Sequence, residues 1–511
     1  MGSKDAEVMK EGIIMKKLMT LALAAAMMLG AATGANAIDF KAKGQWIMSF
    51  DYGMHGNFGE SKAKNNSGFK NEDEFEARQR VRLQLDAVAS EALSGTVFFE
   101  IGDQVWGDND NGGALGADGK VVELKRAYID WMVPQTDLKV RMGIQGIALP
   151  SFTTNASQIM DDDVAAISLN YQFNENVGLT AFWARPYNDN GGYSSRWDTD
   201  YDKNYMDNMD MFAVLLPLTF DGVKVTPWVM YAAMGPGMFD NLEKDPGNAW
   251  GRASAGMVSG FTGTDPLDTY GNAFWAGVTG EVTYWDPFRI AWDVNYGSAS
   301  YADEKMNREG WLASLLLEYK LDWGTPGLYG WYSTGDDNNP KNGSERMPVV
   351  SANGNNDFSN FAFNGNPYIA REGILGSTMV GTWGIGARLK DVSFLEDLKH
   401  TLRVNFMGGT NAPKMAKYVS HNSFKDSASV TQYGTSYDPM YLTTDDYALE
   451  IGLTNTYKMY DNFTIMLDAA YVALWLDDST STWGKNPGRS ALGGDGVYDA
   501  WNVNLSFVYS F

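Results

Sequence analysis

Short and long connections alternate strictly along this chain of 511 residues. Period-two alternation of apolar and polar residues, broken by Gly, Asn, Asp and Pro, predicts eighteen strands joined by eight short turns and nine long loops. Both ends of the strand array then lie on the short-turn side. A soluble sandwich or propeller has no reason to sort loop lengths by parity. A membrane-spanning antiparallel β-barrel does sort its loops in this way, because its periplasmic turns are short and its outer loops are long.

The predicted strands form one domain, residues 38–511, of the all-β class. They lie near 40–52, 74–88, 96–104, 122–133, 137–146, 164–173, 177–187, 209–220, 223–233, 272–285, 288–298, 311–323, 327–334, 378–390, 399–409, 446–459, 462–475 and 501–511. The pair at 209–220 and 223–233 is the least regular, because Pro217 and Pro227 interrupt it.

The last eleven residues show the alternation most clearly. Their length fits the roughly 9–11 residues that a tilted strand needs to cross a hydrocarbon layer. One face carries only apolar or aromatic residues: Trp501, Val503, Leu505, Phe507, Tyr509 and Phe511. Such a strand could also close a soluble sandwich with its apolar face turned inward, so the strand alone does not decide between the two.

Aromatic residues gather at the ends of the predicted strands. Six of the eight short turns have one at or beside them, as at Trp131, Phe173, Phe220, Trp323 and the 284–288 segment. Amphipathic rings concentrate at the boundary between water and lipid, and membrane barrels carry such girdles. The placement favours a barrel whose apolar face meets lipid.

The first 37 residues are predicted to be a leader region that is removed. Lys16 and Lys17 form a positive segment after Met15, the expected start of the signal peptide (15–37). An apolar run follows at 18–29, and Ala35-Asn36-Ala37 fits an A-x-A cleavage site. The apolar run is too short to span a bilayer as a helix. The protein is therefore expected to be exported.

Composition narrows the possible functions. The formal net charge is −23, and removal of three acidic and four basic residues with the leader makes it −24, which argues against a nucleic-acid partner. With no cysteine, and with His55, His400 and His421 outside any catalytic signature, we expect no cofactor, no metal site and no enzymatic activity. A hydrolase or protease barrel is the enzymatic alternative.

Arginines share one face of the second predicted strand. Arg78, Arg80 and Arg82 alternate with a face that is apolar except for Gln79, and Arg126 and Arg141 extend this polar wall on the fourth and fifth strands. An eighteen-stranded barrel is too wide for its side chains to fill, so a water-filled lumen is expected. Charges that line such a lumen govern which solutes pass.

The third long loop, residues 147–163, carries Ile147, Leu149, Phe152 and Ile159, which a solvated outer loop would not need. It ends in Asp161-Asp162-Asp163. We predict that the loop folds into the barrel and that these carboxylates face the arginines across a constriction. An ordinary solvated loop and a merely polar lumen are the alternative.

These features resemble the general diffusion porins of Gram-negative bacteria. The opening segment Ile38-Asp-Phe-Lys-Ala-Lys-Gly-Gln-Trp46, the strand Arg78-Gln-Arg-Val-Arg82 and the end at residues 504–511 look closest to the homotrimeric porins of sulfate-reducing bacteria of the Desulfovibrio type. The resemblance implies an outer-membrane homotrimer of separate pores that pass small hydrophilic solutes or ions. It also allows sixteen strands, and the third loop lacks the Pro-Glu-Phe-Gly-Gly type of motif found in enterobacterial porins.

Partners follow from the same resemblance. Outer-membrane lipid and lipopolysaccharide are expected to surround the barrel. Tyr509 and Phe511 fit the C-terminal signal that the barrel assembly machinery reads. Two other functions remain open: a substrate-selective channel, and a structural or surface-binding barrel whose long loops are the active part.

Overall fold

The computed structural model describes residues 38–54, 74–109, 112–117, 119, 122–188, 208–235, 256–259, 261, 270–352, 355–370, 373–416, 418, 440–477 and 498–511. The predicted leader, residues 1–37, lies outside this part of the chain. No helix in the described ranges is long and apolar enough to cross a membrane.

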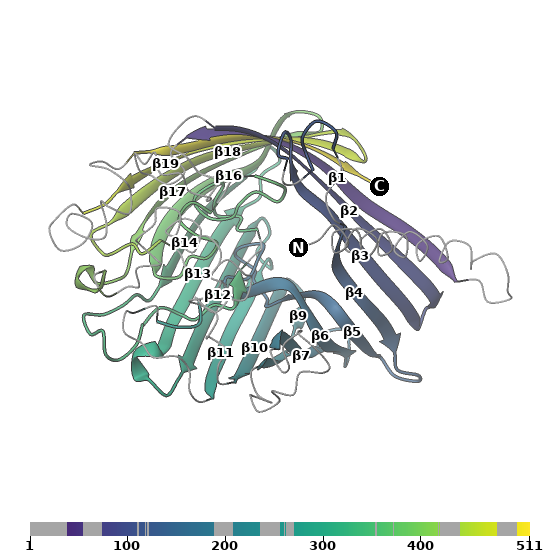
Figure 1. Ribbon diagram of the computed structural model, residues 1–511, viewed down its shortest axis with the longest axis horizontal. Helices are drawn as coiled ribbons and strands as arrows, with labels where there is room; N and C mark the ends of the chain where they lie inside the picture. The colour runs from purple at the N-terminus through teal and green to yellow at the C-terminus, as the bar shows by residue number, and fades with distance from the viewer. Residues whose placement is uncertain are drawn as a thin grey trace, which may run out of the picture.

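The protein is a closed antiparallel β-barrel of eighteen strands, as predicted (Figure 1). The sheet is made of β1 (Asp39–Met54), β2 (Glu74–Ser90), β3 (Leu93–Val105), β4 (Glu123–Met132), β5 (Leu138–Ala148), β6 (Met160–Gln172), β7 (Gly178–Asn188), β8 (Asn208–Leu215), β9 (Leu218–Phe220), β10 (Val223–Met234), β11 (Gly271–Val282), β12 (Phe288–Ser300), β13 (Arg308–Tyr319), β14 (Thr325–Ser333), β15 (Ser351–Ala352), β16 (Thr382–Leu395), β17 (Leu398–Gly409), β18 (Tyr447–Tyr460), β19 (Phe463–Trp475) and β20 (Ala500–Ser510). Each strand of the wall pairs with its sequence neighbours, and β20 closes the ring on β1.

Two of these elements do not add crossings of their own. β8 and β9 both pair with β10 and are separated at Leu216 and Pro217, because proline has no amide hydrogen to donate to the ladder. β15 lies inside the barrel and pairs in parallel with the start of β6. The wall therefore keeps the eighteen crossings that the sequence pattern predicts.

The apolar face of the wall points outward. On β20, Asn504 and Ser506 are completely buried inside, while the Trp501 to Phe511 row lies on the outer surface with Tyr509 and Phe511 exposed. The predicted aromatic belt is exposed as well, with Phe173, Phe220, Tyr284, Trp285, Phe288, Trp323 and Tyr460 at the short-turn ends. A soluble sandwich would bury this face, so that alternative is excluded.

Much of the lumen is filled by protein. The largest apolar cluster lies inside the ring and combines wall residues such as Trp275 with Phe358 and Phe363 of the long connection between β14 and β16. Within the described residues, this cluster contains none from β1–β4. The sequence predicted an open, water-filled lumen. The lumen is open only on the β1–β5 side, because inward-folded loops occupy the other side.

The hairpin of β5 and β6 leaves the wall and enters the barrel. Pairing between β4 and β5 ends at Ala127 and Ile144, whereas pairing between β5 and β6 continues to Ala148 and Asp161. Gly143 lies at the departure point with φ 132, where a Cβ would come within 2.2 Å of the Ala127 carbonyl oxygen. Only glycine tolerates this combination of backbone angle and close approach. The bend of this hairpin is visible in Figure 1.

Candidate functional site

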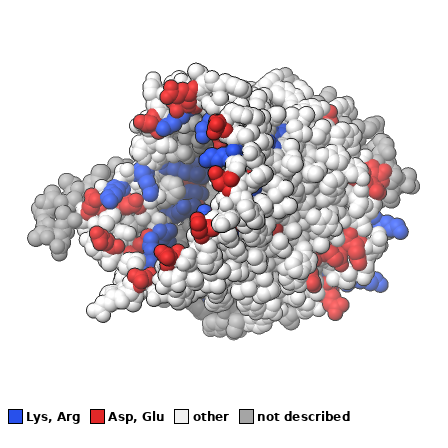
Figure 2. All heavy atoms as spheres, turned by 180° about the vertical axis from the view of Figure 1, so that it is seen from behind, with Lys and Arg blue, Asp and Glu red and all other residues white. Residues whose placement is uncertain are grey.

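A hollow on the β1–β5 side of the barrel is lined by basic residues (Figure 2). Seven cations with partly exposed side chains belong to this surface, which we call the basic wall: Arg78, Arg80, Arg82, Lys125, Arg126, Lys139 and Arg141. Alternation places the arginines of β2, β4 and β5 on the inner face, as the sequence predicted, together with Lys139. Lys125 precedes Arg126 directly and reaches the same side because the ladder between β3 and β4 shifts register there. The predicted arginines therefore do lie together.

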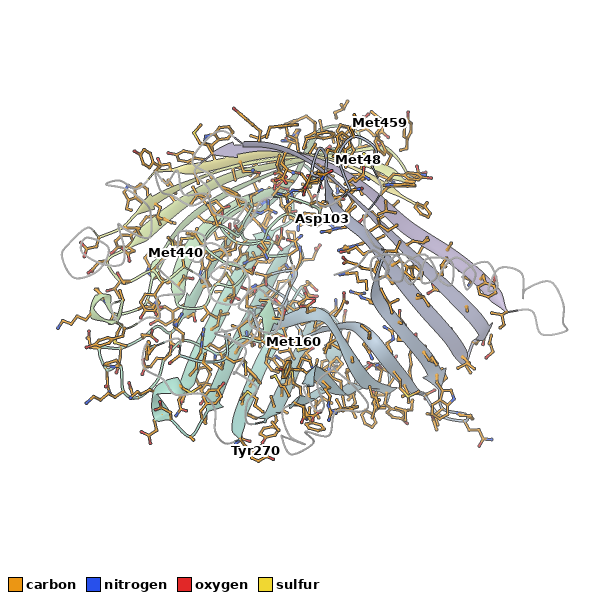
Figure 3. The ribbon with its side chains drawn as sticks, viewed as in Figure 1. Met48, Asp103, Met160, Tyr270, Met440 and Met459 are labelled. Atoms are coloured by element: carbon orange, nitrogen blue, oxygen red, sulfur yellow. The ribbon has the colours of Figure 1, made fainter. Side chains whose placement is uncertain are left out.

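Each arginine of β2 is paired with a carboxylate of the wall itself. Arg78 Nη2 lies 2.6 Å from Glu76 Oε2, and Arg82 Nε lies 2.6 Å from Glu100 Oε2. Arg80 donates through two nitrogens to Asp103, at 2.6 and 2.7 Å. Asp103 lies on the inner side of the ring in Figure 3. The sequence reasoning missed Glu100 and Asp103, although both stand on the strand next to the arginines.

The prediction that Asp161, Asp162 and Asp163 all face the arginines across the lumen does not fit the strand that carries them. The three aspartates belong to the start of β6, not to the loop, so alternation sends their side chains to opposite faces. Asp163 faces the basic wall and accepts from Arg126 Nε at 2.5 Å and from Lys125 Nζ at 2.9 Å. Asp162 points away and accepts from Ser351 Oγ at 2.7 Å. Asp161 forms no ion pair with Arg78, Arg80 or Arg82.

Arg141 of β5 lies on the same wall, nearer to the short turn between β4 and β5. It donates through Nε and Nη2 to Asp130, at 2.6 and 2.8 Å, and its guanidinium stacks 4.0 Å above the Tyr128 ring centroid. Lys139 also reaches Asp130, at 3.0 Å. The seven cations of the basic wall thus share five carboxylates, Glu76, Glu100, Asp103, Asp130 and Asp163, which leaves two positive charges in excess among these bonded groups.

The side of the hollow opposite the basic wall is formed by two inward loops. The first, residues 149–159, joins β5 to β6 and is the loop predicted from the sequence. Its residues Leu149 and Ile159 are buried, and Figure 3 shows Met160 inside the ring. The predicted inward path of this loop is therefore what the structure shows.

The second inward loop, residues 334–381, was not predicted. It joins β14 to β16, and its backbone carbonyl at Ile369 accepts from Ser49 Oγ of β1 and from Asn504 Nδ2 of β20. Ser49 is the register partner of Arg78, so the loop docks one strand away from the basic wall. Its buried Phe358, Phe361 and Phe363 could have signalled the inward path by the same reasoning that was applied to the first loop.

A buried ion-pair network fastens the second loop to the wall. The Asp357 carboxylate forms ion pairs with Arg388 and Arg403, at 2.6 Å each, and with Lys390 at 3.1 Å. Arg388 also forms an ion pair with Glu318. Arg289 in turn forms ion pairs with both Glu318 and Glu281. Burial acts to raise the pKa of the Asp357 carboxyl, but the three cations outweigh it and hold this pKa well below its usual range. Asp357 is therefore ionised at neutral pH.

The two loops also contact each other. Gln158 of the first loop accepts from Met379 N at 3.0 Å through its side chain and from Thr378 Oγ1 at 3.2 Å through its backbone. Ile159 O accepts from the backbone amides of Val350 and Ser351, both at 3.0 Å. Together the loops form one body that confines the open part of the lumen to the β1–β5 side.

The described residues contain no group of three or more His, Asp or Glu side chains placed to hold a metal ion. The candidate site is a hollow lined by fixed charges and hydrogen-bonding groups.

Comparison with known proteins supports the fold. No family model and no curated protein matches the sequence. Among solved structures, a BenF-like porin from Pseudomonas fluorescens Pf-5 matches with a TM-score of 0.50 and 9% identity, covering 93% of this chain and 99% of that chain. OpdQ from Pseudomonas aeruginosa matches with a TM-score of 0.49 and 10% identity, covering 93% and 98%.

The chain thus has the fold of a porin barrel over nearly its whole length. At this level of identity the likeness concerns the fold alone. The closer resemblance to the porins of sulfate-reducing bacteria therefore remains a prediction.

Proposed function

We propose that this protein is an outer-membrane channel through which small hydrophilic solutes and ions diffuse passively. The observation that carries the proposal is the hollow between the basic wall and the two inward loops, inside a barrel with an apolar outer face. Lipid requires such a closed sheet, since every backbone group must find a partner within the protein. The porin fold of the solved structure from Pseudomonas fluorescens supports the same interpretation.

The mechanism follows from the charges of the passage. A solute that enters from the outer side passes between the ion-paired arginines of β2 and the β5–β6 hairpin. The arginine side chains are held in place by their carboxylate partners, so they present fixed donors to the solute without first ordering themselves. Asp86 and Asp161 also act on Arg141 and Arg126, so the solute meets fixed charges of both signs at this point.

A substrate-selective channel is the second candidate, and one observation favours it. The inward loops and the large apolar cluster occupy much of the lumen, so the passage is confined to one side of the barrel. A narrow passage with fixed donors discriminates between solutes better than a wide one does. A structural or surface-binding barrel is the third candidate.

Planar-bilayer recording tests the three candidates. Unspecific current steps that scale with salt concentration support the passive channel. Block of the current by particular solutes, with structurally related solutes as controls, supports the selective one. A folded protein that inserts into the bilayer without conductance would leave only the structural role.

The location and assembly are part of the same proposal. We propose an outer membrane of a Gram-negative bacterium, lipopolysaccharide as a neighbour, and a homotrimer. Migration on a gel with and without boiling tests both barrel closure and subunit number. A single folded species at the mass of one chain would overturn the trimer.

A further inference from the structure

Asp293 of β12 binds the tip of the first inward loop. Its carboxylate accepts from Phe152 N at 2.9 Å, from Thr153 N at 3.0 Å and from Ser151 Oγ at 2.8 Å, and the Thr153 hydroxyl donates to it as well. The loop starts on β5 and ends on β6, so these bonds join it to a strand on another side of the lumen. Asp293 is 3% exposed.

Glu450 of β18 binds the second inward loop in the same way. Its Oε1 accepts from three consecutive backbone amides, Asn360 N at 2.9 Å, Phe361 N at 2.6 Å and Ala362 N at 3.0 Å. Its Oε2 accepts from Ser359 Oγ and from Asn405 Nδ2 of β17, both at 2.9 Å. Glu450 is completely buried.

The two carboxylates share a feature that sets them apart from those of the basic wall. Among the ion pairs formed by described residues, none includes Asp293 or Glu450. Each buried negative charge is instead compensated by hydrogen-bond donors, most of which belong to a loop. A buried charge without such donors is strongly unfavourable, and so are buried amides without an acceptor. Each carboxylate and the loop that it binds therefore stabilise each other only when that loop lies inside the barrel.

We propose that Asp293 and Glu450 are the positioning residues that hold the two loops inside the barrel and thereby set the width of the passage. The effect on width rests on the proposed channel function, whereas the effect on loop position does not. Because the loops contact each other at Gln158 and Met379, release of one is expected to loosen the other.

Thiol labelling tests the position of each loop directly, since the chain contains no cysteine. Ala362→Cys places a probe in the Glu450 contact, and Ala156→Cys places one in the first loop, at positions 0% and 3% exposed. Addition of Glu450→Ala or Asp293→Ala is expected to speed labelling of the probe in the same loop at least about tenfold, the factor set by one lost charge-assisted hydrogen bond. Unchanged labelling rates would overturn the proposal.

Two further variants separate positioning from general damage. Glu450→Gln keeps an oxygen that can accept from the three amides, so labelling of the Ala362→Cys probe should stay slow. Asp210→Asn removes a carboxylate that binds Arg185 on the outer face of the barrel and should change the labelling rate of neither probe. Heat-modifiable migration confirms that each barrel is closed. Cleavage of the cysteine-free Glu450→Ala protein by chymotrypsin near Phe361 and Phe363 provides a measurement without an introduced thiol.

Conductance connects the loops to the passage. Glu450→Ala and Asp293→Ala should each give larger or noisier current steps than the wild-type protein, while Glu450→Gln and Asp210→Asn should not. Faster labelling with unchanged conductance would contradict a role in setting the width. A wild-type protein without conductance would refute the channel function, and the labelling rates would still decide whether the carboxylates hold the loops.

Discussion

Arg126 of β4 and Asp163 of β6 are joined by a hydrogen bond of 2.5 Å between Nε and Oδ1, across the point where the β5–β6 hairpin leaves the wall. Both residues flank a strand, β5, that no longer pairs with β4 at this level. The contact therefore links β4 of the wall to the inward hairpin, and it lies at the edge of the hollow. This ion pair therefore contributes charge to the passage and also holds the inward hairpin that forms one of its sides.

Neutralising the arginines of β2 should change ion preference. The triple variant Arg78→Gln, Arg80→Gln, Arg82→Gln leaves Glu76, Glu100 and Asp103 in the lumen without these partners, so the wall becomes net negative there. We expect the reversal potential in a salt gradient to shift toward cations, with a severalfold fall in the anion-to-cation permeability ratio. Arg185→Gln, on the outer face, is the control. An unchanged potential would remove the three arginines from the passage.

Neutralising Asp163 should have the opposite effect. Asp163→Asn deprives Lys125 and Arg126 of a shared carboxylate, so more positive charge faces the solute. The reversal potential should move toward anions. Asp162→Asn provides a matched control one residue away, because Asp162 points to Ser351 instead of the basic wall. Equal shifts in both variants would show that the faces of β6 are not separated as described.

Gly143 should be intolerant of a side chain. A valine there would need a positive φ and would meet the Ala127 carbonyl oxygen. Such backbone strain costs on the order of 1–3 kcal/mol, and the steric contact adds to it. We expect Gly143→Val to lower the temperature at which the folded species disappears from the gel. Gly95→Ala, where the nearest atom lies 4.0 Å from the new Cβ, should leave that temperature unchanged.

Mild acid should not release the second inward loop at Asp357. A carboxyl whose pKa is lowered in the folded state contributes stability at every pH above its unfolded value, roughly 3.9, and loses the contribution only below it. Because Arg388, Arg403 and Lys390 lower the pKa of Asp357, these contacts persist between pH 7 and pH 5. The difference in conductance between the wild-type protein and Asp357→Asn should therefore be the same at both pH values. Asp357→Asn, which breaks the contacts at any pH, supplies the positive comparison.

Phe511, predicted to be read by the barrel assembly machinery, should matter for assembly more than for conductance. Phe511 exchanges two backbone hydrogen bonds with Gly44, at 2.8 and 3.0 Å, and its ring is exposed on the outer surface. Deletion of Phe511 should lower severalfold the amount of protein found in the outer membrane of an expressing cell. The same variant refolded in detergent should conduct normally. Phe507→Leu, which keeps the terminal residue, is the control, and equal membrane levels of all three proteins would refute an assembly signal.

Local patterns in the sequence were enough to specify the wall of this protein. Strand alternation, turn residues and aromatic positions are local properties, and each strand of a barrel contacts its neighbours in chain order. For this reason the eighteen strands, the outward face of the 501–511 segment and the inner position of Arg78, Arg80 and Arg82 could all be predicted. The apolar residues of the 147–163 segment likewise indicated an inward path.

The contents of the barrel, by contrast, emerged only from the folded structure. Asp162 and Asp163 lie on opposite faces of β6 by alternation. Because the hairpin bends inward at Gly143, one of these faces meets the basic wall and the other meets the second inward loop. In the sequence, Asp293 and Glu450 look like ordinary inner-wall carboxylates. Their partners come from distant loops, as Ser151 does for Asp293 across a sequence separation of 142. Contacts of this kind depend on how long loops fold back across the lumen, and no periodicity in the sequence encodes them.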